Sequence, residues 1–183
     1  MKLSYYKFIL VFVFVLLFAS FTSAQTESNK GIELYEKGEY ETAVEHLQKA
    51  IETDKKDRNS WLYLGMSLAR LKKGNEAVRA FKKADELPIK DLLENERAVK
   101  ITAKPRANYT DLARQNNTSG TVALAVEFGA DGNIKSIILV QGLPNGLVEQ
   151  TISAARKIKF EPAIKDGKSV AAIRIFKYSF TIY

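Results

Sequence analysis

The feature that most constrains this chain is an internal repeat of 34 residues in its first half. Four residues recur at that spacing: Gly31, Ala43, Leu47 and Ala50 return as Gly65, Ala77, Phe81 and Ala84. This period is typical of a helix-turn-helix unit. Glycine and alanine allow two helices to approach closely, and we expect the larger Leu47 and Phe81 to fill the groove between hairpins. The spacing predicts one repeat over about residues 24–57 and a second over about 58–91.

The second repeat resembles the tetratricopeptide (TPR) family. It has that family's residues in order, with Pro88 near the family's closing proline: Trp61, Leu64, Gly65, Ala77, Phe81 and Ala84. The first repeat keeps Gly31, Ala43, Leu47 and Ala50, but no tryptophan corresponds to Trp61. The resemblance implies a concave surface that binds a peptide or protein, although so short an array could equally serve to space or dimerise a second domain.

Two repeats are fewer than such arrays usually need for stability, so something must cover the open end. Residues 90–100 place Leu92 and Val99 seven positions apart, with Leu93 beside them. This spacing predicts a capping helix with polar flanks.

The first 24 residues have the organisation of an export signal. Lys2 and Lys7 give a short basic start, residues 8–18 are an unbroken apolar run, and Thr22-Ser23-Ala24 offers small residues at the positions that a signal peptidase recognises. We expect cleavage to leave Gln25 as the first residue. The alternative is a retained membrane anchor, which the polar residues near position 20 disfavour because a bilayer span needs about 20 predominantly apolar residues.

Charge divides the remaining chain near residue 100. Residues 25–100 contain 15 basic and 15 acidic residues, whereas residues 101–183 contain 11 basic and 6 acidic ones. We therefore predict two domains, 25–100 and 101–183. The basic second domain favours acidic partners on approach, although ordinary solvation of a surface explains the same charges equally well. The chain has no cysteine, which excludes disulfides and a lipid-modified N-terminal cysteine.

No combination of residues in the sequence indicates an enzyme. The single histidine, His46, has neither a second histidine nor a cysteine to complete a metal site or a catalytic pair. Phosphate-binding glycine loops and nucleophile motifs are absent, and the basic residues are dispersed rather than clustered as in nucleic-acid-binding proteins. We predict a binding protein with no catalytic residue, no metal, no cofactor and no nucleic-acid partner.

In the second domain the apolar spacing changes from helical to alternating. Val122, Leu124, Val126 and Phe128 predict one face of a strand, residues 129–133 predict a turn, and the alternation resumes at Ile134. An amphipathic helix is predicted by the spacing of Val148, Ile152, Ala155 and Ile158. A final strand is predicted over about residues 170–183.

The predicted topology follows from the handedness of crossovers. The first two strands form a hairpin, and a right-handed return through the helix places the third strand beside the first, in the order 2-1-3. The last strand is then an edge. The predicted fold class is α+β, with helical repeats and a capping helix followed by a three-stranded antiparallel or mixed sheet packed with helices.

The second domain resembles the TonB C-terminal domain. The matching stretches are Tyr109-Thr110-Asp111-Leu112-Ala113-Arg114, Gly120-Thr121-Val122, Asp131-Gly132-Asn133-Ile134 and Lys159-Phe160-Glu161-Pro162. The chain departs from the family at Thr110, where a proline is usual.

The resemblance implies a way of binding. In that family the domain reaches across the periplasm and pairs its last strand with a short segment of an outer-membrane receptor. For this chain it implies a periplasmic adaptor that pairs an edge strand with a TonB-dependent receptor or another envelope protein. The residues implied are Ile173, Arg174, Ile175, Phe176, Lys177 and Tyr178.

Two alternatives remain open at this point. The first is an energy transducer for TonB-dependent transport, anchored in the inner membrane and driven by motor proteins of the ExbB/ExbD type. The chain has no histidine before position 46 and no proline-rich spacer, which disfavours this role. The second is a structural module whose edge strand is covered by another copy of the chain in a homodimer.

Overall fold

The computed structural model describes residues 23–88 and 96–182. The chain divides into two compact units, with the boundary between Leu87 and Pro88. The apolar run at residues 8–18, on which the predicted export signal depends, lies outside the described residues. Within the described ranges, no helix combines the length and apolar character needed to cross a bilayer.

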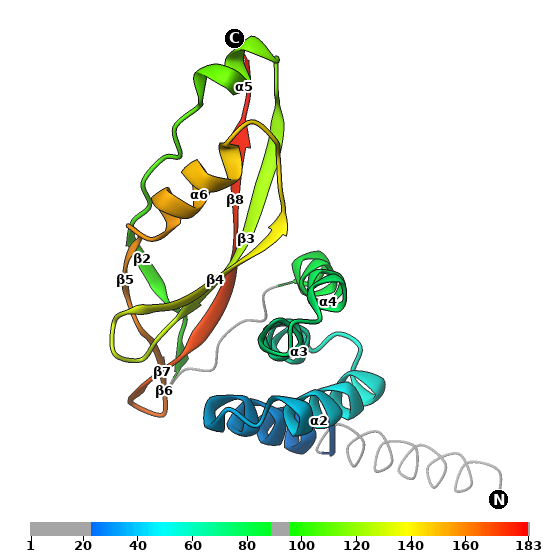
Figure 1. Cartoon of the computed structure of the whole chain (residues 1–183). Helices are drawn as coiled ribbons and strands as arrows, with labels where there is room; N and C mark the ends of the chain where they lie inside the picture. Colours follow the sequence, from blue (N-terminus) through cyan, green and yellow to red (C-terminus); the bar gives the residue numbers. More distant parts are fainter. Residues whose placement is uncertain (1–22, 89–95, 183) are drawn as a thin grey trace, which may run out of the picture. The chain divides into compact units, whose positions relative to one another are not determined.

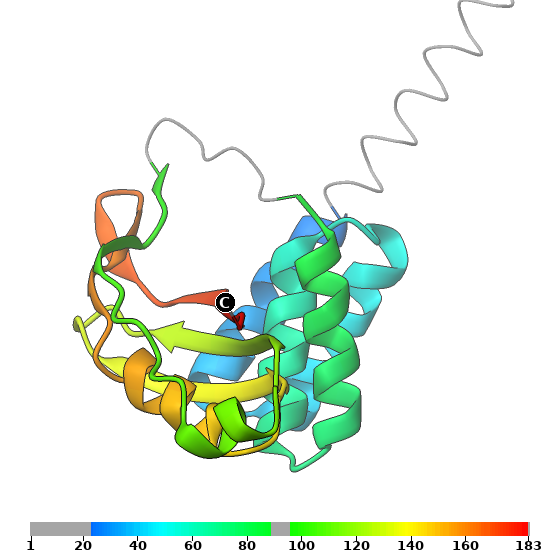
Figure 2. The same ribbon diagram turned by 90° about the horizontal axis from the view of Figure 1, so that it is seen from above.

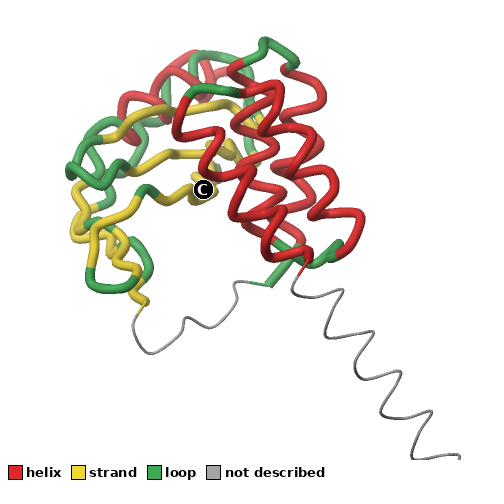
Figure 3. The backbone as a smooth tube through the Cα atoms, turned by 90° about the horizontal axis from the view of Figure 1, so that it is seen from below, coloured by secondary structure: helices red, strands yellow, loops and turns green. Residues whose placement is uncertain are grey.

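The first unit consists of helical hairpins (Figures 2 and 3). Residues 23–37 are helical, followed by α2 (Tyr40–Thr53), α3 (Arg58–Arg70) and α4 (Gly74–Glu86). Gly38, with φ of 83°, ends the first of these helices in a conformation that favours glycine. The Asp57 carboxylate accepts hydrogen bonds from the amides of Asn59 and Ser60 and so caps α3. The helices follow the predicted 34-residue period.

The repeated glycines lie where the two helices of a hairpin touch. A Cβ atom at Gly31 would lie 2.6 Å from Leu47 Cγ, and one at Gly65 would lie 2.7 Å from Phe81 Cε1. Leu47 and Phe81 therefore pack inside their own hairpins, against the repeated glycines. A methyl group at either glycine would push the paired helices apart.

The start of the first unit overlaps the predicted cleavage point. Ala24 is buried, and the Ser60 hydroxyl donates a hydrogen bond to the buried Ser28 hydroxyl over 2.8 Å. The bond between Ala24 and Gln25 therefore lies within a helix that packs into the repeat core.

The predicted capping helix is wrong where the structure describes it. Glu96–Arg97 is strand β1, Lys100–Ala103 is strand β2, and Val99 is buried in the core of the second unit. Residues 90–95, which include Leu92 and Leu93, lie outside the described residues. The pairing of β1 with β6 (Ala163–Lys165) and of β2 with β5 (Lys159–Glu161) outweighs the helical spacing. The second unit therefore includes these residues, and the predicted boundary at residue 100 is too late.

The second unit is built on a three-stranded antiparallel sheet. Its strands are β3 (Gly120–Phe128), β4 (Ile134–Gln141) and β8 (Ala172–Phe180), in the order β4-β3-β8. This is the predicted order 2-1-3. Helix α6 (Leu147–Ala155) lies across one face of the sheet, and the short α5 (Asp111–Gln115) precedes β3 (Figure 1).

The core of this unit lies between the sheet and α6. The predicted apolar face of β3 is fully buried there, together with Phe176, Tyr178 and Phe180 of β8. The buried face of α6 differs from the predicted apolar face: Leu147 is fully buried, whereas Val148 is half-buried. The helix ends at Ala155, so the core residue Ile158 follows it.

Two small sheets were not predicted. Strand β5 (Lys159–Glu161) pairs with β2, while β6 (Ala163–Lys165) pairs with both β1 and β7 (Lys168–Val170). Between β6 and β7, Asp166 and Gly167 have φ of 49° and 74°, as a tight two-residue hairpin requires. The predicted last strand therefore begins too early, because residue 170 belongs to β7 and β8 starts at Ala172.

Thr110 has a clear structural role despite its departure from the family's proline. Its side-chain oxygen accepts a hydrogen bond from the Ala113 amide and caps α5. Its hydroxyl also donates to the Asn145 carbonyl over 2.6 Å, which ties α5 to the turn before α6.

Candidate strand-pairing edge

Strand β8 forms one edge of the three-stranded sheet (Figure 1). It pairs with β3 without a register shift, from Gly120↔Phe180 to Phe128↔Ala172. Within the described residues, no strand pairs with its other side. All six residues implied by the TonB resemblance lie in this strand. A regular edge of this kind exposes backbone donors and acceptors at every second residue.

One contact on β3 shows which residues of β8 face outward. The Gln141 side-chain amide donates to the Thr121 carbonyl over 3.2 Å. Gln141 belongs to β4, so the Thr121 carbonyl faces β4 and not β8. In an antiparallel pair, both partners of a residue pair face each other or both face away. Ser179, which pairs with Thr121, therefore directs its amide and carbonyl away from β3.

A second contact gives the same alternation. The Lys104 ammonium donates a hydrogen bond to the Lys177 carbonyl over 3.0 Å, from outside the β3–β8 pair. Since backbone direction alternates along a strand, Ile173 and Ile175 share the outward orientation of Lys177. The intervening residues direct their backbone amides and carbonyls toward β3.

The side chains of the inward-pairing residues are part of the core. Phe176 and Tyr178 are 8% and 6% exposed, and both belong to the cluster beneath the sheet. Neither ring is available to a binding partner. Among the six implied residues, a partner strand would therefore meet the backbone of Ile173, Ile175 and Lys177, while Phe176 and Tyr178 hold β8 in place.

Tyr178 carries an unsatisfied polar group into this core. Its hydroxyl is buried and has no hydrogen-bond partner among the described residues. Burial raises the pKa of the Tyr178 phenol above its ordinary value because the charged phenolate would lose solvation.

Lys104 lies beside the outer side of β8. Its Nζ is 4.4 Å from the centroid of the Tyr178 ring and 5.5 Å from that of Phe176. Contact with ring faces favours a cation, but the accompanying loss of solvent lowers the pKa of Lys104 below its ordinary value. Lys104 was not among the predicted site residues. Its position depends on the path of the irregular segment after β2, which has no periodic signal in the sequence.

Arg174 is held in a similar way. Its guanidinium donates to the Val99 carbonyl over 3.2 Å and lies 5.7 Å from the centroid of the Phe176 ring. Neither Arg174 nor Lys104 has a carboxylate ion-pair partner in the described ranges.

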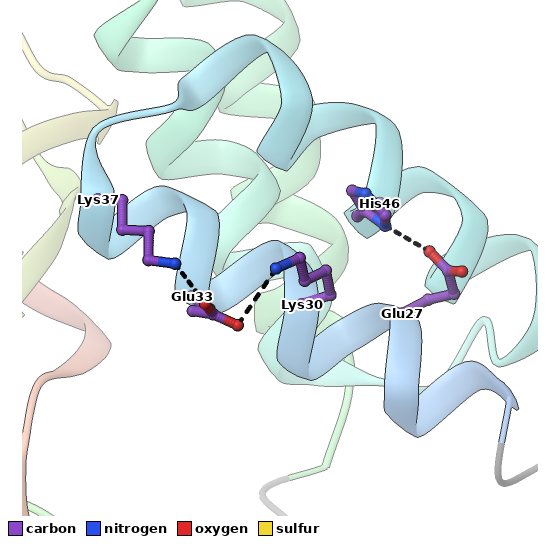
Figure 4. A network of polar contacts seen from close by, with 5 residues as sticks. All are labelled: Glu27, Lys30, Glu33, Lys37 and His46. Atoms are coloured by element: carbon purple, nitrogen blue, oxygen red, sulfur yellow. Dashed lines mark hydrogen bonds and ion pairs between the residues drawn. The ribbon is translucent and has the colours of Figure 1, made fainter.

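The first unit contains two groups of polar contacts on its helices (Figure 4). His46 Nδ1 lies 2.7 Å from Glu27 Oε2, and this pair links α2 to the preceding helix. Glu33 bonds both Lys30 and Lys37, and the hydrogen bond from Lys37 is the main cause that lowers the pKa of Glu33. Glu33 and its two lysines are exposed, and such pairs contribute little to stability.

The residues expected to pack the repeats are buried with one exception. Trp61 is half-buried, and its indole donates to the Lys55 carbonyl over 3.1 Å. The buried members are Gly31, Ala43, Leu47, Ala50, Leu64, Gly65, Ala77, Phe81 and Ala84. In the part of the chain that the structure describes, no group of three or more histidine, cysteine, aspartate or glutamate side chains could hold a metal ion.

Comparison with known proteins identifies both units. Residues 31–74 match the family model of the TPR repeat, and residues 105–182 match that of the Gram-negative bacterial TonB protein C-terminal. These matches confirm both resemblances and their order. Both are protein-interaction domains, and the second is typical of cell-envelope proteins.

Two relatives match a shorter stretch of the chain. The Superkiller complex protein 3 of Mus musculus and that of Homo sapiens are each 34% identical to this chain over 55 residues. The aligned stretch covers 30% of this chain and 4% of each relative's length. The similarity is therefore confined to a local stretch of both chains.

Proposed function

We propose that this chain, in which TPR repeats precede a TonB C-terminal domain, is a periplasmic adaptor. Its β8 edge binds an extended segment of an outer-membrane TonB-dependent receptor or another envelope protein. The repeat module holds a second protein. The export signal predicted at residues 1–24 supports this location.

The observation that carries this proposal is the orientation of the β8 backbone. Ile173, Ile175, Lys177 and Ser179 direct amides and carbonyls to the side that no described strand occupies. An extended peptide can pair with such a row by strand addition, in which main-chain hydrogen bonds supply affinity. Because Phe176 and Tyr178 anchor the strand in the core, the edge is held in place before a partner arrives.

Site-specific photo-cross-linking in cells tests this proposal. A photoreactive residue replacing Lys177 or Ser179, both exposed on β8, should capture an envelope protein that mass spectrometry can identify. The matched control replaces Lys135, an exposed lysine on the opposite edge strand β4, and should not capture the same protein. A cross-link at Lys177 to a second copy of this chain alone would favour the structural dimer.

A backbone variant provides an independent check. Lys177→Pro removes an outward amide, so it should abolish the cross-link from Ser179 while the protein stays folded. Lys177→Ala, which keeps the amide, should retain the cross-link. If both variants capture the partner equally, main-chain pairing at β8 is not the mode of binding.

A further inference from the structure

Two cations at β8, Lys104 and Arg174, have no acidic partner among the described residues. Lys104 and Arg174 contact carbonyl oxygens and ring faces, and neither pairs with a carboxylate of the described residues. On the opposite edge strand the cation is neutralised: Lys135 Nζ lies 2.7 Å from Asp131 Oδ2. The β8 side therefore has positive charge available to an incoming group.

Lys104 also occupies a position that a partner strand needs. Its Nζ lies 3.0 Å from the Lys177 carbonyl oxygen, one of the outward acceptors of β8. A partner amide that bonds to this oxygen must displace the ammonium or share the oxygen with it. The displaced ammonium would lose its hydrogen bond while it lies against the rings of Tyr178 and Phe176.

We propose that Lys104 makes the β8 edge selective for an extended segment with an acidic side chain. The carboxylate of that segment accepts a hydrogen bond from the Lys104 ammonium, while a backbone amide of the partner donates one to the Lys177 carbonyl. This inference rests on the strand pairing proposed above and adds the chemical class of the partner.

The geometry indicates where the acidic residue lies. Side chains alternate between the two faces of a strand, and the Lys104 ammonium lies against the rings of Phe176 and Tyr178, on the core face. The acidic side chain of the partner therefore projects to that same face. Arg174 lies on it too and extends the positive charge along the strand, whereas Lys177 projects to the opposite face.

Matched peptides test the selectivity on the full chain. The probes are nine-residue peptides of alternating valine and threonine, with one glutamate placed at each position in turn, and a second set has glutamine instead. At one or more positions the glutamate peptide should bind about two- to fivefold more tightly than its glutamine counterpart, the gain typical of a partly exposed ion pair. Fluorescence anisotropy measures affinity, and hydrogen exchange at residues 173–179 reports the site.

Variants of the two lysines isolate the role of Lys104. Lys104→Met keeps an apolar chain over the rings and removes the ammonium, so the glutamate preference should disappear and the glutamine peptides should bind more tightly than they do to the wild type. Lys104→Gln should also lose the preference. Lys135→Met makes the same change in charge on the opposite edge strand β4 and should keep the preference.

The outcomes separate this inference from the proposed function. If glutamate and glutamine peptides protect β8 equally, or if Lys104→Met keeps the preference, the role of Lys104 is refuted while strand pairing stands. If no peptide of either set binds, both the strand pairing and the selectivity are contradicted.

Discussion

The two edge strands of the sheet differ in their regularity. Strand β8 pairs with β3 along its whole length without a shift, whereas the β3–β4 ladder is interrupted between Ala123 and Leu124 and again between Glu127 and Phe128. Such irregularities bend a strand and break the even spacing of its outward groups, which is one way in which proteins prevent edge pairing. The same sheet therefore has one edge suited to a partner strand and one that is not.

The two edges also differ in charge, and this difference again favours β8 as the edge that binds a partner. At β4 the cation Lys135 is neutralised by Asp131, and hydrogen bonds from Lys135 and Asn133 hold the pKa of Asp131 well below its usual range. At β8 the ammonium of Lys104 bonds a backbone carbonyl. A lysine near an edge commonly discourages unwanted strand pairing. Here the Lys104 ammonium bonds the Lys177 carbonyl oxygen, which is an acceptor that a partner strand would use.

The largest expected effect distinguishes the inner and outer amides of β8. Tyr178→Pro removes an amide that faces β3 and a ring from the core, so it should destabilise the second unit by about 4 kcal/mol or more. Lys177→Pro removes an outward amide and should cost about 1 kcal/mol or less. Urea unfolding followed by circular dichroism measures both.

Tyr178→Ala serves as the control for the lost ring, because it removes the aromatic group but keeps the amide. If Lys177→Pro destabilises the unit as much as Tyr178→Pro does, the assigned alternation of β8 is wrong.

The second prediction applies the same test to β4. Ile138 pairs with Ala125, whose backbone faces β4, so Ile138→Pro should cost about 3 kcal/mol. Leu139 faces outward by the same alternation, and Leu139→Pro should cost about 1 kcal/mol or less. Thermal melting of each variant measures the difference. Leu139→Pro should not affect partner capture from β8, and a loss of capture in this variant would remove the functional distinction between the edges.

A smaller effect is expected from the buried hydroxyl on β8. Tyr178→Phe removes a polar group that has no partner among the described residues and should stabilise the second unit by about 1 kcal/mol. Because the pKa of Tyr178 is raised in the folded state, the wild type loses stability as the pH rises above 10.0, the ordinary tyrosine value.

The advantage of the Tyr178→Phe variant should therefore grow in alkaline solution. Chemical denaturation at neutral and alkaline pH checks this, and destabilisation at both would show that the hydroxyl has a favourable contact.

The smallest effect concerns the charge at β4. Asp131→Asn leaves Lys135 without its carboxylate and should lower the melting temperature only slightly at neutral pH, because the pair is exposed. Since the pKa of Asp131 is depressed in the folded state, its contribution is present above the ordinary value of 3.8 and is lost as the pH falls below it. Melting curves of the two proteins should converge in acid, and a constant difference would exclude the ion pair as the cause.

Strong periodicity explains what the sequence predicted well. The 34-residue spacing indicated the helical hairpins, and alternation at Val122 to Phe128, together with crossover handedness, indicated the sheet order. The hairpin of β6 and β7 was missed although Asp166-Gly167 is a strong turn signal, because the flanking strands are three residues each. The capping helix was wrong because tertiary pairing of residues 96–103 overrides local spacing.

The candidate site was harder to predict from the sequence than the fold. The family resemblance directed attention to residues 173–178, but periodicity does not say which backbone groups of a strand face inward. That alternation became clear from two hydrogen bonds, one from Gln141 to Thr121 and one from Lys104 to Lys177. Each bond joins residues that are distant in the sequence. Lys104 has no distinguishing feature as a residue type, and its role depends on where the segment after β2 runs.

The burial of Ala24 has a consequence for the predicted export signal. A signal peptidase requires an accessible, extended backbone, whereas the bond after Ala24 lies in a helix and its alanine is packed in the repeat core. If a signal peptidase cuts this bond, as the sequence predicts, cleavage must therefore precede folding of the first hairpin. Faster hairpin folding, or slower delivery to the peptidase, would then leave a larger share of molecules uncut.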